Sequence, residues 1–230
     1  MSTFRFKQFA ISQDRCAMKV GTDGVLLGAW ALVPETTETD IPRILDIGTG
    51  TGLIALMMAQ RFPKAKVTGI DIDDYAVRQA FENVAASPFA DRVTIIRGDI
   101  RTTQFEHQFN AIVCNPPYFA NSLESPDAQR TLARHTASLS LRELMNHSWR
   151  LLADNGELSV VTPFDSKSQI ESEAALTGFF KVRQYAIKTT TSKPPRRLLT
   201  AFRKHPSQLE ASEIVIGSEA YNEMTKDFYL

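Results

Sequence analysis

The segment Arg43-Ile-Leu-Asp-Ile-Gly-Thr-Gly-Thr-Gly52 joins a short apolar run to three glycines at alternate positions. A helix-forming stretch, Leu53 to Arg61, follows it directly. Glycine is favoured where the backbone takes a positive φ or passes close to a ligand, and the first turn of a helix leaves backbone N–H groups without partners beside such a bend. The segment therefore predicts a strand, a ligand-binding turn and a helix, the first unit of an α/β domain.

The same alternation of β-branched runs and helix-period runs continues through most of the chain. This pattern is typical of a largely parallel sheet that is covered by helices. Further strands are expected at 66–70, 93–96, 109–114, 157–162, 181–187 and 197–203, which makes seven with 43–47. The last two are expected to pair antiparallel, because no helix separates them. Val77, Ala80, Phe81 and Val84 are expected to share one face of a helix, and Ser140-Leu-Arg-Glu143 predicts a capping box at the start of another.

Three segments stand outside this alternation. Residues 1–35 are interpreted as an N-terminal extension that packs on the core and ends in an apolar helix. Residues 36–205 form the core, within which the long polar connection 119–139 is consistent with a lid or with disorder. Residues 206–230 form an acidic tail with a short strand candidate at 213–216, counted as part of the same single domain.

The composition limits the class of protein. The chain has 230 residues, 26 Lys and Arg against 26 Asp and Glu, and two cysteines, which suits one domain in a reducing cytosol. The N-terminus does not resemble a signal peptide, and the longest apolar run is far below the roughly 20 residues that span a bilayer. The four histidines show no metal-binding spacing. We therefore expect a cytoplasmic protein without a membrane segment or a metal; zero net charge excludes a uniformly basic surface but allows a local basic face.

Acidic residues stand at the ends of the first three core strands: Asp46, Asp71 and Asp99. In an open α/β sheet these ends meet at the crevice where ligands bind. Asp71 could accept hydrogen bonds from a ribose diol, and Asp99 could accept one from the exocyclic amine of an adenine. Each residue alone could equally be a loop or cap residue. A dinucleotide fingerprint would need a glycine where Leu53 stands, and no phosphate-binding loop of the P-loop type is present.

The fourth strand runs into Asn115-Pro-Pro-Tyr118. The two prolines fix the backbone and could simply make a rigid turn. Chemically, the Asn115 amide oxygen and the Pro116 carbonyl could both accept hydrogen bonds from an aromatic amine, while Tyr118 stacks on its ring. Positioning of this kind can supply roughly 7–11 kcal/mol of a reaction barrier. Cys114 is interpreted as a buried strand residue and not as a nucleophile.

Together these motifs resemble the S-adenosylmethionine-dependent class I methyltransferases, and Asn115-Pro-Pro-Tyr118 is similar to the branch that methylates adenine N6, guanine N2 or a glutamine amide. The resemblance extends over nearly the whole chain to the bacterial tRNA1(Val) (adenine(37)-N6)-methyltransferase family. It is carried at the ends by Phe6-Lys-Gln-Phe9, Asp14-Arg-Cys-Ala-Met-Lys-Val-Gly-Thr-Asp-Gly24, Leu26-Leu-Gly-Ala-Trp30 and Phe228-Tyr-Leu230.

The resemblance implies a Rossmann-like fold with a mostly parallel seven-stranded sheet, helices on both faces and an antiparallel edge strand. It implies S-adenosyl-L-methionine as the methyl donor, S-adenosyl-L-homocysteine as the product, and no metal. The segment from Lys19 to Asp23 would lie against the donor, with Thr22 and Asp23 at its methionine end, although Thr22 could instead be a helix N-cap. The implied donor-binding residues are Thr22, Asp46, Gly48, Thr49, Gly50, Gly52, Asp71, Ile72, Asp99, Ile100 and Asn115, and the implied catalytic residues are Asn115, Pro116, Pro117 and Tyr118.

The expected substrate is an adenosine in the anticodon loop of a valine tRNA, which is single-stranded and can be turned out easily. Six basic residues and no acidic one lie between Lys188 and Lys204, a pattern that suits phosphate contacts but also an ordinary solvated face. The candidate RNA contacts are Arg130, Arg134, Lys193, Arg196 and Arg197. Alternatives are methylation of a protein glutamine, of guanine N2 or adenine N6 in rRNA, or a donor-binding module without catalysis. No obligatory protein partner is expected.

Overall fold

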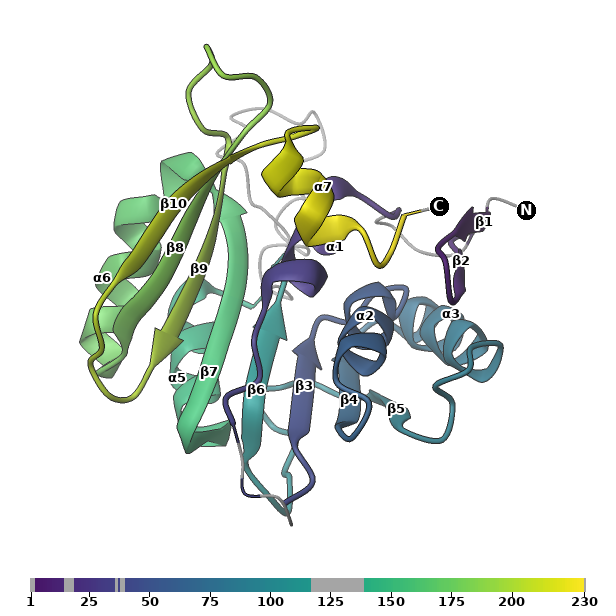
Figure 1. Ribbon diagram of the computed structural model, residues 1–230. Helices are drawn as coiled ribbons and strands as arrows, with labels where there is room; N and C mark the ends of the chain where they lie inside the picture. The colour runs from purple at the N-terminus through teal and green to yellow at the C-terminus, as the bar shows by residue number, and fades with distance from the viewer. Residues whose placement is uncertain (1–2, 15–18, 36, 38–39, 117–138, 230) are drawn as a thin grey trace, which may run out of the picture.

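A sheet of eight strands forms the centre of the computed structural model, which describes residues 3–14, 19–35, 37, 40–116 and 139–229 (Figure 1). The strand order is β10-β8-β9-β7-β6-β3-β4-β5. The strands are β3 (Arg43–Ile47), β4 (Lys66–Asp71), β5 (Val93–Arg97), β6 (Phe109–Cys114), β7 (Leu152–Pro163), β8 (Phe180–Lys188), β9 (Arg197–Arg203) and β10 (Glu210–Val215). A separate hairpin pairs β1 (Thr3–Arg5) with β2 (Ala10–Ser12).

All strands of this sheet run parallel except β9, which is antiparallel to both neighbours, β7 and β8. The antiparallel pairing expected from the missing helix between β8 and β9 is thus confirmed. The expected number of seven strands is wrong, because β10 adds an eighth strand parallel to β8. Four of its six residues are exposed and Ile214 alone is buried, so its side chains carry too little hydrophobic alternation to reveal its full length.

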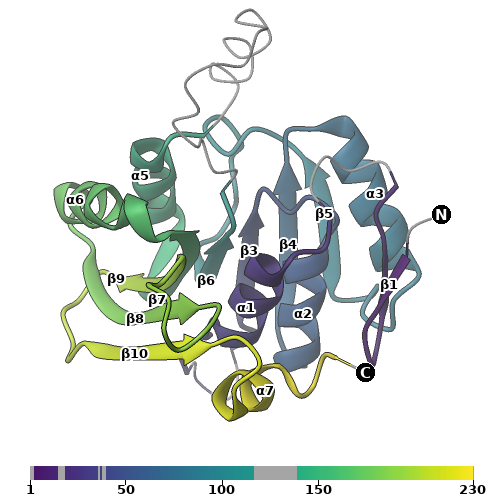
Figure 2. The ribbon, with the colours of Figure 1, turned by 90° about the horizontal axis from the view of Figure 1, so that it is seen from above.

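Helices cover both faces of the sheet, as Figure 2 shows. On one face lie α1 (Thr22–Trp30), α2 (Leu53–Arg61), α3 (Asp74–Ala85) and α7 (Glu219–Thr225); on the other lie α5 (Leu141–Leu151) and α6 (Lys167–Thr177), with a short 3-10 turn η1 (Phe164–Ser166) before α6. Each face has its own apolar cluster, and buried side chains of β3 contribute to both. The sheet therefore has two buried faces, as its continuous apolar strands predict.

Local signals account for several helix boundaries. The predicted capping box at α5 is confirmed: the Ser140 hydroxyl accepts from the Glu143 backbone N–H, and the Glu143 carboxylate accepts from the Ser140 N–H at 2.9 Å. The predicted shared face of α3 is only partly right, because the Phe81 side chain is 63% exposed. Its buried positions follow an i, i+3, i+4, i+7, i+8 pattern through Ala76, Gln79, Ala80, Asn83 and Val84, which leaves Phe81 at the edge of the buried stripe.

The C-terminal segment packs against the β1–β2 hairpin (Figure 1). The Phe6 ring stacks on Phe9 with centroids 4.8 Å apart and lies 6.2 Å from the Tyr229 ring. The Lys7 N–H donates to the Phe228 carbonyl at 2.9 Å. Phe6, Phe9 and Phe228 belong to the same apolar cluster as α1 and α2. The C-terminal segment thus holds the hairpin from which the chain continues toward α1.

Candidate cofactor site

The glycine turn connects β3 to α2 with positive φ at Gly48, Gly50 and Gly52 (71°, 57° and 81°). The turn is fixed to the neighbouring strand β4, because the N–H groups of Gly48 and Thr49 both donate to the Ile70 carbonyl at 2.9 and 3.1 Å. A Cβ atom built on Gly48 would meet no atom within 4 Å. The turn therefore exposes backbone to open space, which is the form of a cradle for a ligand that approaches closely.

Asp46 is the penultimate residue of β3, behind this turn, and is fully buried. Its Oδ2 accepts from the Thr49 hydroxyl at 2.7 Å and from the Ala55 N–H at 3.1 Å. Burial raises its pKa to about 7 in spite of these two hydrogen bonds. The carboxyl group thus joins the glycine turn to the start of α2 through hydrogen bonds to the protein itself.

The acidic residues of the next two strands also hold the backbone around them. Asp71 accepts from the Gly50 N–H at 2.9 Å and from the Asp73 N–H at 3.0 Å. The Asp99 carboxylate receives two parallel bonds from the Arg101 guanidinium, at 2.9 and 2.7 Å, and these hydrogen bonds hold the pKa of Asp99 below its usual value. Ile72 is 51% exposed beside Asp71, whereas Ile100 is buried.

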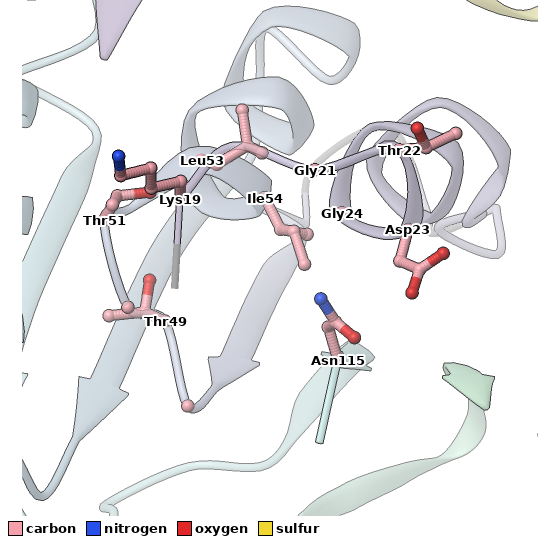
Figure 3. Close-up of a pocket in the computed structure, with 12 residues that line it drawn as sticks. Lys19, Gly21, Thr22, Asp23, Gly24, Thr49, Thr51, Leu53, Ile54 and Asn115 are labelled. Atoms are coloured by element: carbon pink, nitrogen blue, oxygen red, sulfur yellow. The ribbon is translucent and has the colours of Figure 1, made fainter. Parts of the chain in front are cut away.

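A cavity of about 240 Å³ opens where the glycine turn meets the ends of β3 and β6 (Figure 3). These strands are adjacent and Ile47 pairs with Cys114, so the residues that follow them, Gly48 and Asn115, lie at the point where the chain order of the sheet reverses. The cavity is lined by Lys19, Gly21, Thr22, Asp23, Gly24, Gly48, Thr49, Gly50, Thr51, Leu53, Ile54 and Asn115.

The cavity brings together five of the residues that the sequence predicts for the donor, namely Thr22, Gly48, Thr49, Gly50 and Asn115. The other six, Asp46, Gly52, Asp71, Ile72, Asp99 and Ile100, do not line it. A volume of 240 Å³ is below the 300–1,000 Å³ usual for sites that hold a drug-sized ligand. The cavity is therefore sized for one end of an extended ligand, whose remainder would lie along the ends of β4 and β5.

The start of α1 supplies a wall that the strand motifs did not predict. Gly24 allows close packing, because a Cβ there would lie 3.1 Å from the Leu53 side chain and 4.0 Å from the Asn115 amide nitrogen. The N-cap of α1 is Gly21, so the alternative reading of Thr22 as an N-cap is wrong. Lys19, Gly21 and Asp23 lie in the segment that the family resemblance places against the donor. The lining residues that were not predicted are Gly24, Thr51, Leu53 and Ile54; the pair of glycines in Gly21-Thr-Asp-Gly24 was the available signal for Gly24.

Asn83 of α3 joins the end of β2 to the glycine turn. Its amide oxygen accepts from the Ser12 N–H, and its amide nitrogen donates to the carbonyls of Ser12 and Thr51, all at 2.9 Å. Asn83 is buried. One side chain therefore fixes the end of β2 against the turn, shortly before the chain reaches the cavity at Lys19.

The predicted catalytic and RNA-binding residues are only partly within the structure. Pro116 is buried next to Asn115 at the end of β6, whereas Pro117, Tyr118, Arg130 and Arg134 lie outside the described residues, as does most of 119–139. Burial raises the pKa of the Cys114 thiol well above its usual value, which agrees with a structural role for it.

The three described RNA-binding candidates lie around the β8–β9 turn. Lys193 and Arg196 are exposed. The Arg197 Nε donates to the Asp23 carboxylate at 2.8 Å, so this guanidinium is turned toward the cavity wall. Lys193 and Arg196 are the two candidates in the described part of the chain whose exposure suits a phosphate contact.

The described residues contain neither a metal-binding cluster nor a membrane-spanning helix. No group of three or more His, Cys, Asp and Glu side chains there is arranged to hold a metal ion. None of the helices formed by those residues has the length and apolar character needed to cross a membrane.

Comparisons with known proteins agree with this geometry. The model of the family described as methyltransferase small domain matches residues 21–192. A tRNA1(Val) (adenine(37)-N6)-methyltransferase from Porphyromonas gingivalis is 47% identical over 91% of this chain and 84% of its own length, and one from Bacteroides thetaiotaomicron is 42% identical over 99% and 97%. A predicted O-methyltransferase from Agrobacterium tumefaciens superposes with a TM-score of 0.65 at 16% identity, over 90% of this chain and 96% of that one. At this low identity the last comparison supports the fold alone.

Proposed function

The chain belongs to the methyltransferase small domain family and, within it, to the tRNA1(Val) (adenine(37)-N6)-methyltransferases; from this membership we propose that it methylates the N6 amine of adenosine 37 in a valine tRNA. The methyl donor is S-adenosylmethionine. The observation that carries the proposal is the near full-length identity of 42–47% to relatives of that name. Asn115 and the glycine turn line the same cavity, which supports an amine-binding role for Asn115 beside the donor.

The described residues fit the donor. Gly48 leaves its side of the turn open, since nothing lies within 4 Å of a Cβ built there. Asp71 and Asp99 stand at the ends of neighbouring strands, where carboxylates can accept from a ribose diol and from an adenine amine. When bound, S-adenosylmethionine supplies an electrophilic methyl group on a sulfonium. The protein then has to present an amine to that carbon and to keep its own polar groups from competing.

Asn115 and Pro116 would present the amine. The nitrogen lone pair of an adenine amine is delocalised into the ring, so the amine is a poor nucleophile until its hydrogens are drawn out of the ring plane. The Asn115 amide oxygen and the Pro116 carbonyl are adjacent acceptors, and the proline ring fixes the backbone that carries the second one. Two fixed acceptors orient the amine before reaction, which is the source of effective molarity. We also assign Tyr118 the stacking on the target ring, and count Pro117 with the same catalytic segment, as the family resemblance implies.

The exposed turn between β8 and β9 is the proposed RNA-binding surface. Lys193 and Arg196 are exposed there, and Arg197 connects the same turn to the cavity wall. Phosphate contacts of this kind give affinity that falls with salt and does not depend on sequence. The target adenosine would then be selected by Asn115 and Pro116 at the end of β6, since a loop nucleotide is turned out at little cost.

The test uses the purified chain with S-adenosylmethionine labelled on the methyl group, and three acceptors: unmodified valine tRNA, rRNA and a release factor. We expect label in the tRNA, recovered as N6-methyladenosine after digestion, and its loss when adenosine 37 is replaced by guanosine. Label confined to the protein acceptor would contradict the proposal in favour of glutamine methylation. Label in rRNA alone would contradict the choice of tRNA.

A further inference from the structure

Tyr75 is an aromatic side chain that stands exposed at the edge of the sheet that carries Asn115. It is 66% exposed and belongs to the first turn of α3, which begins three residues after the end of β4. Both β4 and β6 run parallel to β3, so the residues that follow these two strands lie at the same edge of the sheet. Single exposed aromatic side chains are common on protein surfaces, so the surroundings of Tyr75 decide whether it has a ligand.

Two guanidinium groups accompany Tyr75 at this edge. Arg78 lies three positions later on α3, which places it beside Tyr75 on the helix surface, and Arg97 is the last residue of β5, the strand next to β4. Both side chains are 66% exposed. The Asp74 carboxylate contacts both, at 2.9 Å from Arg78 and 3.7 Å from Arg97. One carboxylate therefore holds two cations near the exposed ring, and we call Tyr75, Arg78 and Arg97 the α3 patch.

Asn115 lies between the α3 patch and the β8–β9 turn. The strand order in this region is β9-β7-β6-β3-β4-β5. Neighbouring strands are about 4.8 Å apart, so the ends of β4 and β5 lie roughly 10 and 14 Å from the end of β6, and the start of β9 lies roughly 10 Å away on the other side. Figure 1 shows α3 and β5 at one end of the sheet and β8 and β9 toward the other. Exposed cations therefore flank the proposed position of the target base on both sides.

We propose that the α3 patch is a second RNA-binding surface, which holds the single-stranded nucleotides next to the target adenosine. Tyr75 stacks on an unpaired base, and Arg78 and Arg97 pair with the phosphates on either side of it. Aromatic rings and guanidinium groups bind unpaired RNA bases in this way, and every base offers a flat face, so the contact needs no particular sequence. The inference rests on the proposed function for the RNA substrate, and it adds a contact across the site from the β8–β9 turn.

Phe81 provides an internal comparison, because it is an aromatic side chain of α3 with nearly the same exposure, 63%. It lies six positions after Tyr75, which is about 9 Å further along the helix axis and away from the edge that carries Asn115. An anticodon loop that reaches the α3 patch would therefore contact Tyr75 without Phe81. A protein partner that docks on the exposed face of α3 would cover Phe81.

The experiment measures the affinity of the chain for unmodified valine tRNA with S-adenosylhomocysteine present, so that no methyl transfer occurs. The variants are Tyr75→Ala, Tyr75→Phe, Arg97→Met and Asp74→Asn. Phe81→Ala is the matched control for the ring. Lys66→Met is the control for charge, because Lys66 is exposed and begins β4 at the opposite edge of the sheet. Each variant is also titrated with S-adenosylhomocysteine alone by calorimetry.

We expect Tyr75→Ala to weaken tRNA binding by about 5-fold or more, the loss of one stacked base, whereas Tyr75→Phe should keep most of the affinity. Arg97→Met should lower the slope of log affinity against log salt concentration by about 0.7, the value for one phosphate contact on a single strand. Asp74→Asn removes a negative charge beside the proposed phosphates and should strengthen tRNA binding at low salt, a gain that loss of structure would not produce. None of these variants should change the affinity for S-adenosylhomocysteine.

Equal affinities of Tyr75→Ala and Phe81→Ala for tRNA would overturn the assignment. So would a salt slope of Arg97→Met that matches that of Lys66→Met, or weaker tRNA binding by Asp74→Asn. If the parent protein neither binds nor methylates valine tRNA, the proposed function itself fails and this inference with it. If the parent protein methylates the tRNA while Tyr75→Ala binds it as tightly as the parent does, only the second surface fails.

Discussion

The two ends of the proposed donor site are built in different ways. The adenosine end consists of Asp71 and Asp99 with their neighbours; the Asp99–Arg101 pair joins residues two positions apart, and Asp71 also accepts from the Gly50 N–H of the glycine turn. The methionine end is the cavity, where the start of α1, the glycine turn and Asn115 come together. That end depends on contacts such as Arg197 with Asp23, which join distant parts of the chain.

This difference explains how each end should respond to change. The Asp99 side chain is held by its own loop, so its replacement should alter one contact with the ligand and little else. At the methionine end, Asn83 joins the glycine turn to Ser12, and Arg197 holds the wall at the start of α1 through Asp23. A substitution at the methionine end can therefore alter the methylation rate, the affinity for the donor or the stability of the fold, and the measurements must separate these three effects.

The largest effect is expected for Asn115→Ala, at the reacting side of the methionine end. The variant removes one of the two proposed acceptors for the amine, and loss of one preorganised hydrogen-bonding group typically costs about 10²–10³-fold in rate. We expect that loss in single-turnover methylation of tRNA, with affinity for S-adenosylhomocysteine changed by no more than about 2-fold. Asn115→Asp keeps an acceptor and should retain more activity. Equal losses of rate and affinity would contradict the proposed role.

The sequence locates the strand ends and the glycine turn far better than the wall that packs against them. Strand ends, the glycine turn and Asp71 are local patterns, so their positions follow once the strands are recognised. The pairing of Arg197 with Asp23 cannot be read in this way, because it depends on β9 lying between β7 and β8. The basic run that contains Arg197 suggested phosphate binding, and only the fold shows that this residue turns toward the cavity wall.

The eighth strand and Phe81 show the same limit. β10 is stabilised by its ladder with β8 and by the Lys188–Glu213 ion pair at 2.7 Å, while its own side chains are mostly exposed. Phe81 has the residue type of a core position but lies at the edge of the buried stripe of α3. In both cases tertiary context overrides the pattern in the sequence.

The next effect concerns Asp46, which supports the glycine turn between the two ends. Burial raises its folded-state pKa to about 7 from a usual 3.8, so the folded protein binds a proton that the unfolded chain has released. Stability should therefore fall as pH rises through this window, by about 2 kcal/mol between about pH 5 and pH 7. Asp46→Asn cannot ionise and should lack this component.

Chemical unfolding of the parent protein and of Asp46→Asn between about pH 5 and pH 7 tests whether stability falls as the pH rises. The stability of Asp46→Asn relative to the parent protein should increase steadily from about pH 5 to pH 7 and then level off. Asp74→Asn is a suitable control, because that carboxylate is 43% exposed in an ion pair with Arg78. A difference between Asp46→Asn and the parent that stays constant with pH would show that Asp46 is ionised in the folded state throughout.

The smallest effect is expected at the adenosine end, for Arg101→Met. Arg101 holds the Asp99 carboxylate by two parallel bonds and also lies 3.6 Å from Glu143 at the start of α5. Without it, Asp99 should accept less well from an adenine amine, and affinity for S-adenosylhomocysteine should fall by about 3- to 10-fold, the size of one ordinary hydrogen bond. S-inosylhomocysteine carries an oxygen in place of that amine, so its affinity should not change.

This pair of ligands separates a local contact from a general loss of structure. Arg142→Met serves as the matched control, since Arg142 is 68% exposed and pairs with Glu173 away from the strand ends. Equal weakening of both ligands by Arg101→Met would mean that the Asp99–Arg101–Glu143 chain supports the start of α5 as much as it reads the adenine. The adenosine end would then depend on a distant part of the chain as the methionine end does, and the contrast between the two ends would no longer hold.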